Sequence, residues 1–92
     1  MAVLTRAEID AALRALPGWR FERNGFSKVF TFAGFPEAVD FVTRLVPGSE
    51  EADHHPDLVI NYRHVTVTFT THSEGGVTEK DIAGAQLADQ CA

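Results

Sequence analysis

Two adjacent histidines, His54 and His55, stand directly before Pro56 in an acidic stretch of the chain. Imidazole is the side chain whose charge changes near neutral pH, so two imidazoles beside carboxyl groups can donate and accept protons. The same pair could equally be surface or hydrogen-bonding residues. The pattern favours general acid–base chemistry, and the neighbouring carboxyl groups are those of Glu50, Asp53 and Asp57.

The remaining two histidines, His64 and His72, fall on one predicted strand. Side chains on a strand alternate between its faces, which places both on the polar face with the threonines, opposite Val65, Val67 and Phe69. Eight residues at about 3.3 Å each separate them by roughly 26 Å. We therefore expect His72, at the strand's end, to join the site and His64 to lie outside it.

A bound metal is the main chemical alternative, because three histidines can hold a zinc ion. Adjacent histidines rarely chelate one ion comfortably, and the spacing matches none of the usual zinc-ligand patterns. The sequence therefore predicts proton transfer without a metal or other cofactor, and metal-dependent hydrolysis is the competing hypothesis. Elemental analysis, with activity measured before and after chelation, separates the two.

The elements that must position these groups begin with a helix and a β-hairpin. Thr5 and Glu8 have the spacing of a capping box, and Pro17-Gly18 end the helix. From Trp19 the apolar pattern alternates, and Asn24-Gly25 is the strongest short hairpin signal available. The helix is expected to bury Ile9, Ala12, Leu13 and Leu16, and the hairpin repeats Trp19, Phe21, Phe26, Phe30 and Phe32 at alternate positions.

A second helix is expected from Pro36, with an apolar stripe of valines. Pro47-Gly48 should kink or end it, because proline lacks the amide proton that the helical ladder needs. Ser49 is then expected to restart a short acidic turn before the histidine pair. The predicted stripe consists of Val39, Val42 and Val46, with Ala38 and Leu45.

The rest of the chain predicts a second hairpin and a last helix. Residues 58–61 and 64–71 read as strands that turn at Tyr62-Arg63. Thr78 and Asp81 have the spacing of a helix cap, and Gly84 is expected to interrupt that helix. The order is α-β-β-α-β-β-α, which predicts an α+β fold in which a four-stranded antiparallel sheet carries helices on one face. Residues 1–92 form one expected domain, and an exposed sheet edge favours a homodimer or homotetramer.

Composition narrows the class of partner. The 92 residues carry 8 Lys and Arg against 13 Asp and Glu, a formal charge of −5, without a basic run that could neutralise nucleic-acid phosphates. No segment is apolar enough for a membrane span, and the start of the chain lacks the pattern of a signal peptide. The single cysteine, Cys91, can form no internal disulfide. We expect a cytoplasmic protein that acts on a small molecule, with no nucleic acid or membrane as direct partner.

These residues also form a recognisable series. The chain has Glu50-Glu-Ala-Asp-His-His-Pro-Asp57, then Tyr62, then a strand closing on His72, and finally Thr78-Glu-Lys-Asp81. In this order they resemble the pterin-4a-carbinolamine dehydratase family. The resemblance implies His54, His55 and His72 as catalytic residues, with Asp81 orienting His72. It also implies a substrate-binding set of Glu50, Pro56, Thr71, Ser73 and Asp81.

The resemblance implies a hydro-lyase without cofactor that removes water from a 4a-hydroxytetrahydropterin to give the quinonoid dihydropterin. His54 and His72 would act as general acids, and His55 would bind the pterin and accept the N5 proton. Leu58 stands where many relatives carry a tryptophan, which predicts altered substrate preference or rate rather than another reaction. The alternative is a non-catalytic pterin-binding or protein-partner module of the same fold, such as a dimerisation cofactor.

Overall fold

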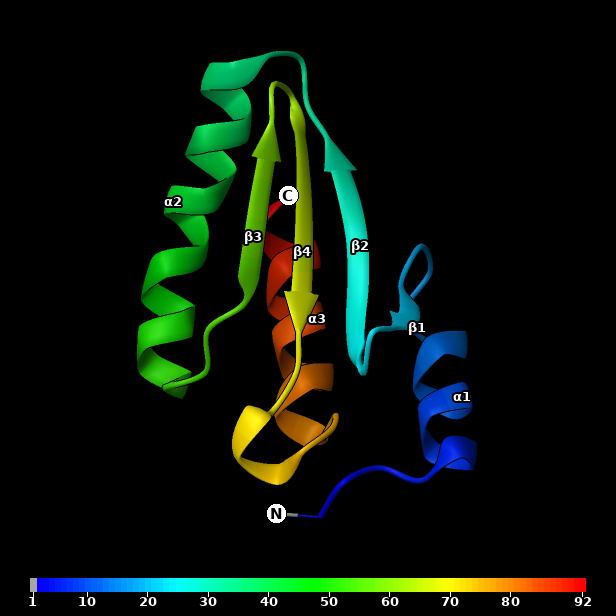
Figure 1. The fold of residues 1–92 in the computed structure, drawn as a ribbon. Helices are drawn as coiled ribbons and strands as arrows, with labels where there is room; N and C mark the ends of the chain where they lie inside the picture. Colours follow the sequence, from blue (N-terminus) through cyan, green and yellow to red (C-terminus); the bar gives the residue numbers. More distant parts are fainter. Residues whose placement is uncertain (1) are drawn as a thin grey trace.

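The predicted element order and fold class are confirmed by the computed structural model, which describes residues 2–92. A four-stranded antiparallel sheet has the order β1-β2-β4-β3, and the helices cover one of its faces (Figure 1). The elements are α1 (Arg6–Arg14), β1 (Arg20–Glu22), β2 (Gly25–Thr31), α2 (Phe35–Ala52), β3 (Asp57–Asn61), β4 (His64–Phe69), the short 3-10 helix η1 (His72–Glu74) and α3 (Glu79–Cys91).

Both hairpins form, and the first turns one residue earlier than predicted. Glu22 pairs with Gly25, so the turn residues are Arg23 and Asn24, with φ of 51° and 61°. Two successive positive φ values give the type I′ geometry that matches the twist of paired strands, and Gly25 belongs to β2. The second hairpin turns at Tyr62-Arg63 as expected, because Asn61 pairs with His64.

Both predicted capping boxes are present. The Thr5 hydroxyl accepts from the Glu8 amide at the start of α1, and Thr78 and Asp81 cap α3 in the same reciprocal way. The predicted interruption at Gly84 is wrong, since α3 continues through it. A Cβ at Gly84 would lie 2.5 Å from the Phe69 ring, so glycine at this position lets the helix approach β4 closely.

The prediction for the second helix is wrong at Pro47-Gly48, because α2 runs unbroken through both residues. Pro47 is exposed, so water can satisfy the carbonyl group that loses its amide partner. Ser49 is a buried residue inside this helix and does not restart a turn. A Cβ at Gly48 would lie 2.7 Å from Leu87, which shows how closely α2 and α3 pack there.

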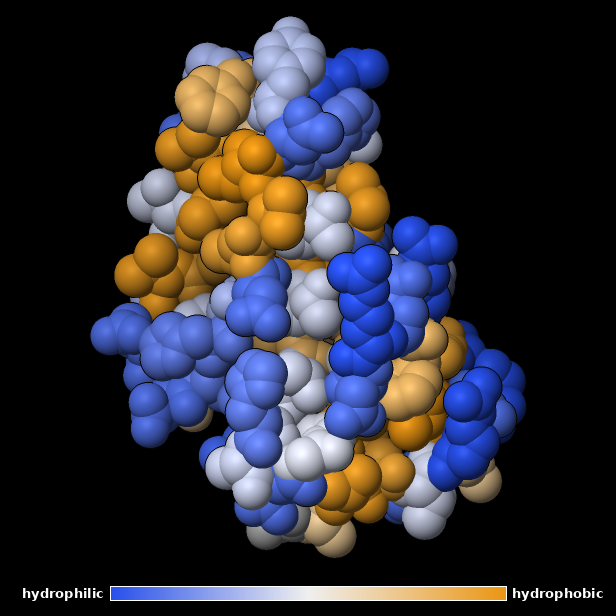
Figure 2. Space-filling view, in the orientation of Figure 1, coloured by the Kyte–Doolittle hydropathy of each residue, from blue (hydrophilic) through white to orange (hydrophobic). Residues whose placement is uncertain are grey.

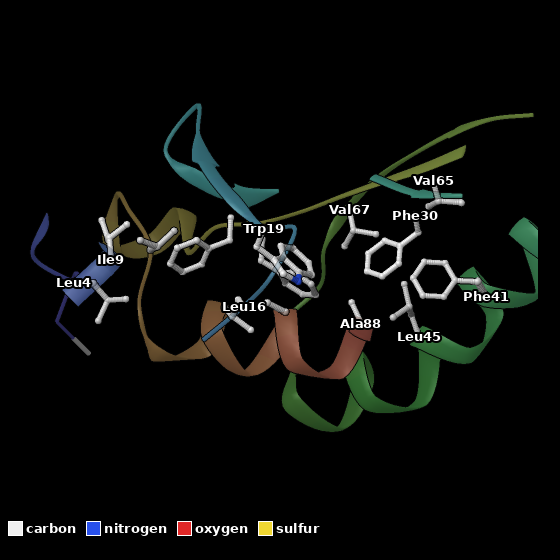
Figure 3. Packing of buried hydrophobic residues seen from close by; sticks show 14 of the residues in the cluster. Leu4, Ile9, Leu16, Trp19, Phe30, Phe41, Leu45, Val65, Val67 and Ala88 are labelled. Atoms are coloured by element: carbon white, nitrogen blue, oxygen red, sulfur yellow. The ribbon is translucent and has the colours of Figure 1, made fainter. Parts of the chain in front are cut away.

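The buried face of α2 also differs from the predicted valine stripe. Val39 and Val46 are 37% and 53% exposed. Ala38 and Leu45 are buried as predicted, and Phe41 and Ser49, which the predicted stripe did not include, are buried with them. Phe41 packs on Phe30 of β2 with ring centroids 4.8 Å apart, and Figure 3 shows Phe41 and Leu45 on the side of the core below the strands. The buried face of α2 is therefore centred on Phe41, and Val39 and Val46 lie at its exposed margins.

Candidate active site

His54 and His55 are placed by the way in which α2 ends. Asp53 caps the helix in the left-handed conformation with φ 50°, and its amide donates to Ser49 and Glu50 carbonyls. The His54 amide also donates to the Ser49 carbonyl at 3.1 Å. The chain then enters β3 through Pro56, so the two imidazoles sit at a fixed corner between a helix and a strand.

His72 is placed by the 3-10 helix and tight turn that follow β4. β4 ends at Phe69, so His72 lies on η1 and not on the strand as predicted. The Thr71 amide donates to the Gly76 carbonyl, and Gly75 closes the turn with φ 75°. The Asn24 amide side chain, from the first hairpin turn, donates to the Gly75 carbonyl at 2.9 Å. The C-terminal end of α2, η1 and the first turn of α3 therefore gather at one end of the molecule, at the bottom of Figure 1.

All three predicted histidines border one open cavity of about 390 Å³, a volume within the usual range of small-molecule sites. Its lining consists of Asp53, His54, His55, Thr70, Thr71, His72, Ser73 and Lys80. His64 is not among these residues. It hydrogen-bonds through Nδ1 to the Thr31 hydroxyl at 2.9 Å, in the register pair at the opposite end of β4.

Behind the cavity, a buried carboxylate holds His54. Asp81 has no exposed surface, and its Oδ1 lies 2.6 Å from His54 Nε2. Its Oδ2 accepts from the Thr71 hydroxyl at 2.7 Å and from the Thr78 amide at 2.8 Å. The sequence-based expectation that Asp81 orients His72 is therefore wrong, because its imidazole partner is His54. The His54 ring, 12% exposed, also stacks over Phe69 at 6.0 Å, so both its plane and one nitrogen are fixed.

His55 has a carboxylate of its own. Its Nε2 lies 2.5 Å from Glu50 Oε2, and both side chains are more than half exposed. Glu50 stands four residues before His54, a spacing that would put the two side chains on one face of a continuous helix. The left-handed Asp53 turns the chain out of the helical register after α2, so Glu50 meets His55 instead. The site thus contains two carboxylate–imidazole pairs of opposite character, one enclosed and one open to solvent.

The remaining predicted substrate-binding residues fall in three environments. Ser73 is exposed on η1 at the cavity. Thr71 is buried, and its hydroxyl is engaged by Asp81 and Thr78. Pro56 borders a neighbouring apolar pocket of about 170 Å³ between α2 and β3, together with Leu58, His55 and Glu50. Sequence reasoning did not select Thr70 or Lys80 for the site. Thr70 shares the strand alternation of His72 and could have been found, whereas Lys80 carried no such signal.

Two further observations concern the described part of the chain. Across residues 2–92, no three His, Cys, Asp or Glu side chains come close enough to hold a metal ion. In that same range, no helix has both the length and the apolar character needed to cross a membrane.

The fold and the cavity define a small α+β protein whose site can move protons between imidazoles and a bound molecule. Residues 2–91 match the family model described as pterin 4 alpha carbinolamine dehydratase. A protein of Mycobacteroides abscessus whose name carries the designation pterin-4-alpha-carbinolamine dehydratase is 46% identical, covering 97% of this chain and 95% of its own. A protein of the same designation from Picosynechococcus is 48% identical, covering 95% of each chain.

Among solved structures, the transcriptional coactivator/pterin dehydratase from Brucella melitensis superimposes with a TM-score of 0.93. It is 39% identical, and the match covers 98% of each chain. The chain therefore belongs to the pterin-4a-carbinolamine dehydratase family, and the predictions of family membership and of a hydro-lyase are confirmed.

Proposed function

We propose that this protein removes water from a 4a-hydroxytetrahydropterin and releases the quinonoid dihydropterin, which returns the pterin cofactor of aromatic amino acid hydroxylation to its reduction cycle. The observation that supports this most directly is the convergence of His54, His55 and His72, from two separate segments, on one open cavity. A dehydration of this kind needs one proton donor and one proton acceptor at a small ring system, and positioned imidazoles supply both.

The step balances within the substrate and the histidines. The N5–H proton passes to His55, the N5 electron pair forms the C4a=N5 double bond, and the C4a–O bond breaks. The departing hydroxyl takes a proton from His54 or His72 and leaves as water. One histidine gains a proton and another loses one, so the enzyme needs only proton exchange with solvent to return to its starting state.

The two carboxylates support this division of roles. Asp81 engages Nε2 of His54, which leaves Nδ1 as the ring nitrogen that a substrate can meet. Glu50 lies against His55 and would stabilise the imidazolium that forms when His55 accepts the N5 proton. His72 has neither arrangement and stands exposed on η1, where it can approach the leaving hydroxyl. Of the residues expected to bind substrate, Thr71 and Ser73 line the cavity and are proposed to border the pterin. Glu50 and Asp81 would act through His55 and His54, and Pro56 lines the adjacent pocket.

The decisive experiment generates the carbinolamine with a pterin-dependent hydroxylase and follows the quinonoid product by absorbance. We expect acceleration by the wild-type protein and a fall in kcat/KM of about 10²- to 10⁴-fold for His72→Ala, the range of a general acid–base group. His64→Ala is the matched control, because that imidazole lies outside the cavity. Unchanged turnover in His72→Ala would remove His72 from the mechanism, and no acceleration by the wild type would leave a pterin-binding or protein-partner module.

We also propose that the protein is a homodimer or homotetramer. β3 is an edge strand, and apolar side chains on β3 and α2 remain exposed, with Val46 at 53% and Val59 at 61%. Figure 2 shows apolar side chains gathered in the upper half of the view, over the region of β3 and α2. The molar mass from light scattering tests the proposal, and a monomer at working concentration would contradict it. A cytoplasmic location stays an expectation.

A further inference from the structure

We propose that Asn24, in the turn of the first hairpin, is a positioning residue for His72. Its side-chain amide holds the turn that carries His72 and so keeps this imidazole at the cavity. The inference rests on the proposed function, since it assumes that His72 meets the substrate. It gives a part in the reaction to the β1-β2 hairpin, none of whose residues borders the cavity.

His72 is held differently from the other two histidines. A carboxylate engages the ring of His54, and another engages the ring of His55. The exposed His72 side chain lies on η1, so its place at the cavity depends on the backbone that carries it. Proton transfer needs the imidazole within hydrogen-bond distance of the reacting group, so any contact that fixes this backbone supports the chemistry.

The backbone that carries His72 is an exposed arc, residues 72–75, anchored at both ends. At the first end Thr71 is buried, and its amide donates to the Gly76 carbonyl at 3.0 Å. At the second end the Gly75 amide donates back to the Thr71 carbonyl at 3.1 Å. The Gly75 carbonyl in turn accepts from Asn24 Nδ2 at 2.9 Å, which ties the arc to a residue 51 positions earlier in the chain.

Asn24 is itself fixed to the sheet. Its backbone carbonyl accepts from the Thr70 hydroxyl at 2.8 Å. The next residue, Gly25, lies so close to β4 that a Cβ there would stand 3.0 Å from the Phe69 carbonyl oxygen. Asn24 has φ 61°, in the left-handed region that asparagine adopts more readily than most residues. The donor to Gly75 is therefore delivered from a turn whose own position is set by the end of β4.

Loss of this donor should free the arc without unfolding the domain. Exposed segments with few anchors open locally at a small free-energy cost. One hydrogen bond shifts such an equilibrium by about threefold to tenfold. Without the Asn24 amide, the fraction of molecules with a correctly placed His72 should fall by the same factor.

The test uses Asn24→Gly in the full chain. Glycine adopts a positive φ without strain, so the turn still forms while the donor is lost. We expect kcat for the carbinolamine to fall about threefold to tenfold, with KM changing less than about twofold. Arg23→Gly is the matched control, because Arg23 shares the turn with φ 51° but does not border the cavity, and it should leave both quantities unchanged. Wild-type kcat in Asn24→Gly would overturn the proposal.

A second variant removes only the donor. Asn24→Asp keeps the size of the side chain and its tolerance of a positive φ, but it places a carboxylate oxygen against the Gly75 carbonyl. Two acceptors repel each other, so kcat should fall further than in Asn24→Gly. A kcat in Asn24→Asp equal to that of the wild type would contradict the role of the amide.

A double-variant comparison separates positioning of His72 from a general loss of stability. In a His72→Ala chain, Asn24→Gly should lower kcat no further, because the residue through which Asn24 acts is gone. Equal fractional losses in the two backgrounds would show that Asn24 affects the rate without His72, and this would overturn the proposal.

Amide hydrogen exchange monitors the arc without any substrate. The amides of Glu74 and Gly75 donate to the Thr71 carbonyl at 3.0 and 3.1 Å. They should exchange about threefold to tenfold faster in Asn24→Gly than in the wild type or Arg23→Gly. Equal exchange in all three chains would overturn the proposal. If the wild type accelerates no carbinolamine, the proposed dehydration fails, whereas faster exchange in Asn24→Gly would still support the hold of Asn24 on the arc.

Discussion

Asp81 and Asp89 lie on the same helix, α3, and have different roles. Asp81 lies in the first turn of α3 with no exposed surface and is joined to His54, Thr71 and Thr78. Asp89 lies two turns further, 32% exposed, and accepts from the Trp19 indole at 3.1 Å and from the Lys28 ammonium at 2.8 Å. Both carboxylates are anchored by donors from distant parts of the chain.

The difference between them lies in the donors. The Trp19 indole and the Lys28 ammonium are donors only, and Lys28 also lies over the Phe30 ring at 4.8 Å, so this cluster ties β2 and the start of β1 to the helix. Asp81 is joined to an imidazole that borders the cavity and can exchange its proton. A carboxylate with fixed donors holds a fold together, whereas one with a titratable donor positions a group for chemistry.

The largest expected effect comes from Asp81→Asn. An amide with one acceptor oxygen cannot serve the Thr71 hydroxyl, the Thr78 amide and His54 Nε2 together, so Nε2 must become an acceptor. His54 then also loses the negative charge that stabilises the protonated, proton-donating form of its ring. We expect kcat to fall about 10²- to 10⁴-fold, with KM changing far less. Carbinolamine turnover measures this. Glu79→Gln, an exposed carboxyl group in the same turn, is the control, and equal losses in both variants would refute the positioning role.

An intermediate effect is expected from Gly84→Ala, because Gly84 lies between the group around Asp81 and the group around Asp89. The new methyl would meet the Phe69 ring, which contacts both Trp19 at 6.4 Å and His54 at 6.0 Å. Overpacking of this kind costs about 1 to 3 kcal/mol of unfolding free energy. Thermal or urea unfolding measures the loss, and turnover should fall as well because His54 shifts.

The control for this variant is Gln86→Ala, on the exposed side of the same helix. If Gly84→Ala were as stable and as active as the wild type, α3 could move away from β4 freely, and the two clusters would not share a rigid support.

The smallest effect is expected from Asp89→Asn. The amide oxygen can still accept from the Trp19 indole, and only the charge opposite Lys28 is lost, so the unfolding free energy should fall by about 1 kcal/mol. Turnover should match the wild type. Asp10→Asn, which removes an exposed partner of Arg6 on α1, should change neither quantity measurably. A large loss of activity in Asp89→Asn would erase the contrast between the two carboxylates.

Some of the site was accessible from the sequence. The threonine–valine alternation before His72 predicted that its side chain and that of His64 would stand far apart on one strand, and only His72 borders the cavity. The capping box of Thr78 and Asp81 was also predicted, because it depends on contacts three residues apart. The partner of Asp81 was not, since His54 lies 27 residues away and nothing local links the two.

The second helix shows the opposite failure. A local rule, that proline ends helices, predicted a break at Pro47, and the structure overrides it because that face of α2 is exposed while Phe41 and Leu45 are buried against the sheet. Phe41 is fully buried in the core, whereas Val39 and Val46 of the predicted stripe are exposed. Where packing supplies more free energy than one lost hydrogen bond removes, a sequence pattern misplaces the end of an element.

By itself, the sequence determined the helix caps, the hairpins, the strand alternation and the presence of imidazoles beside carboxyl groups, because each depends on neighbours within a few residues. The tertiary structure alone decided which carboxylate meets which histidine, and that three imidazoles border one cavity. Those arrangements depend on how α2, β4 and α3 pack, and the angles at which elements meet are set by side chains far apart along the chain.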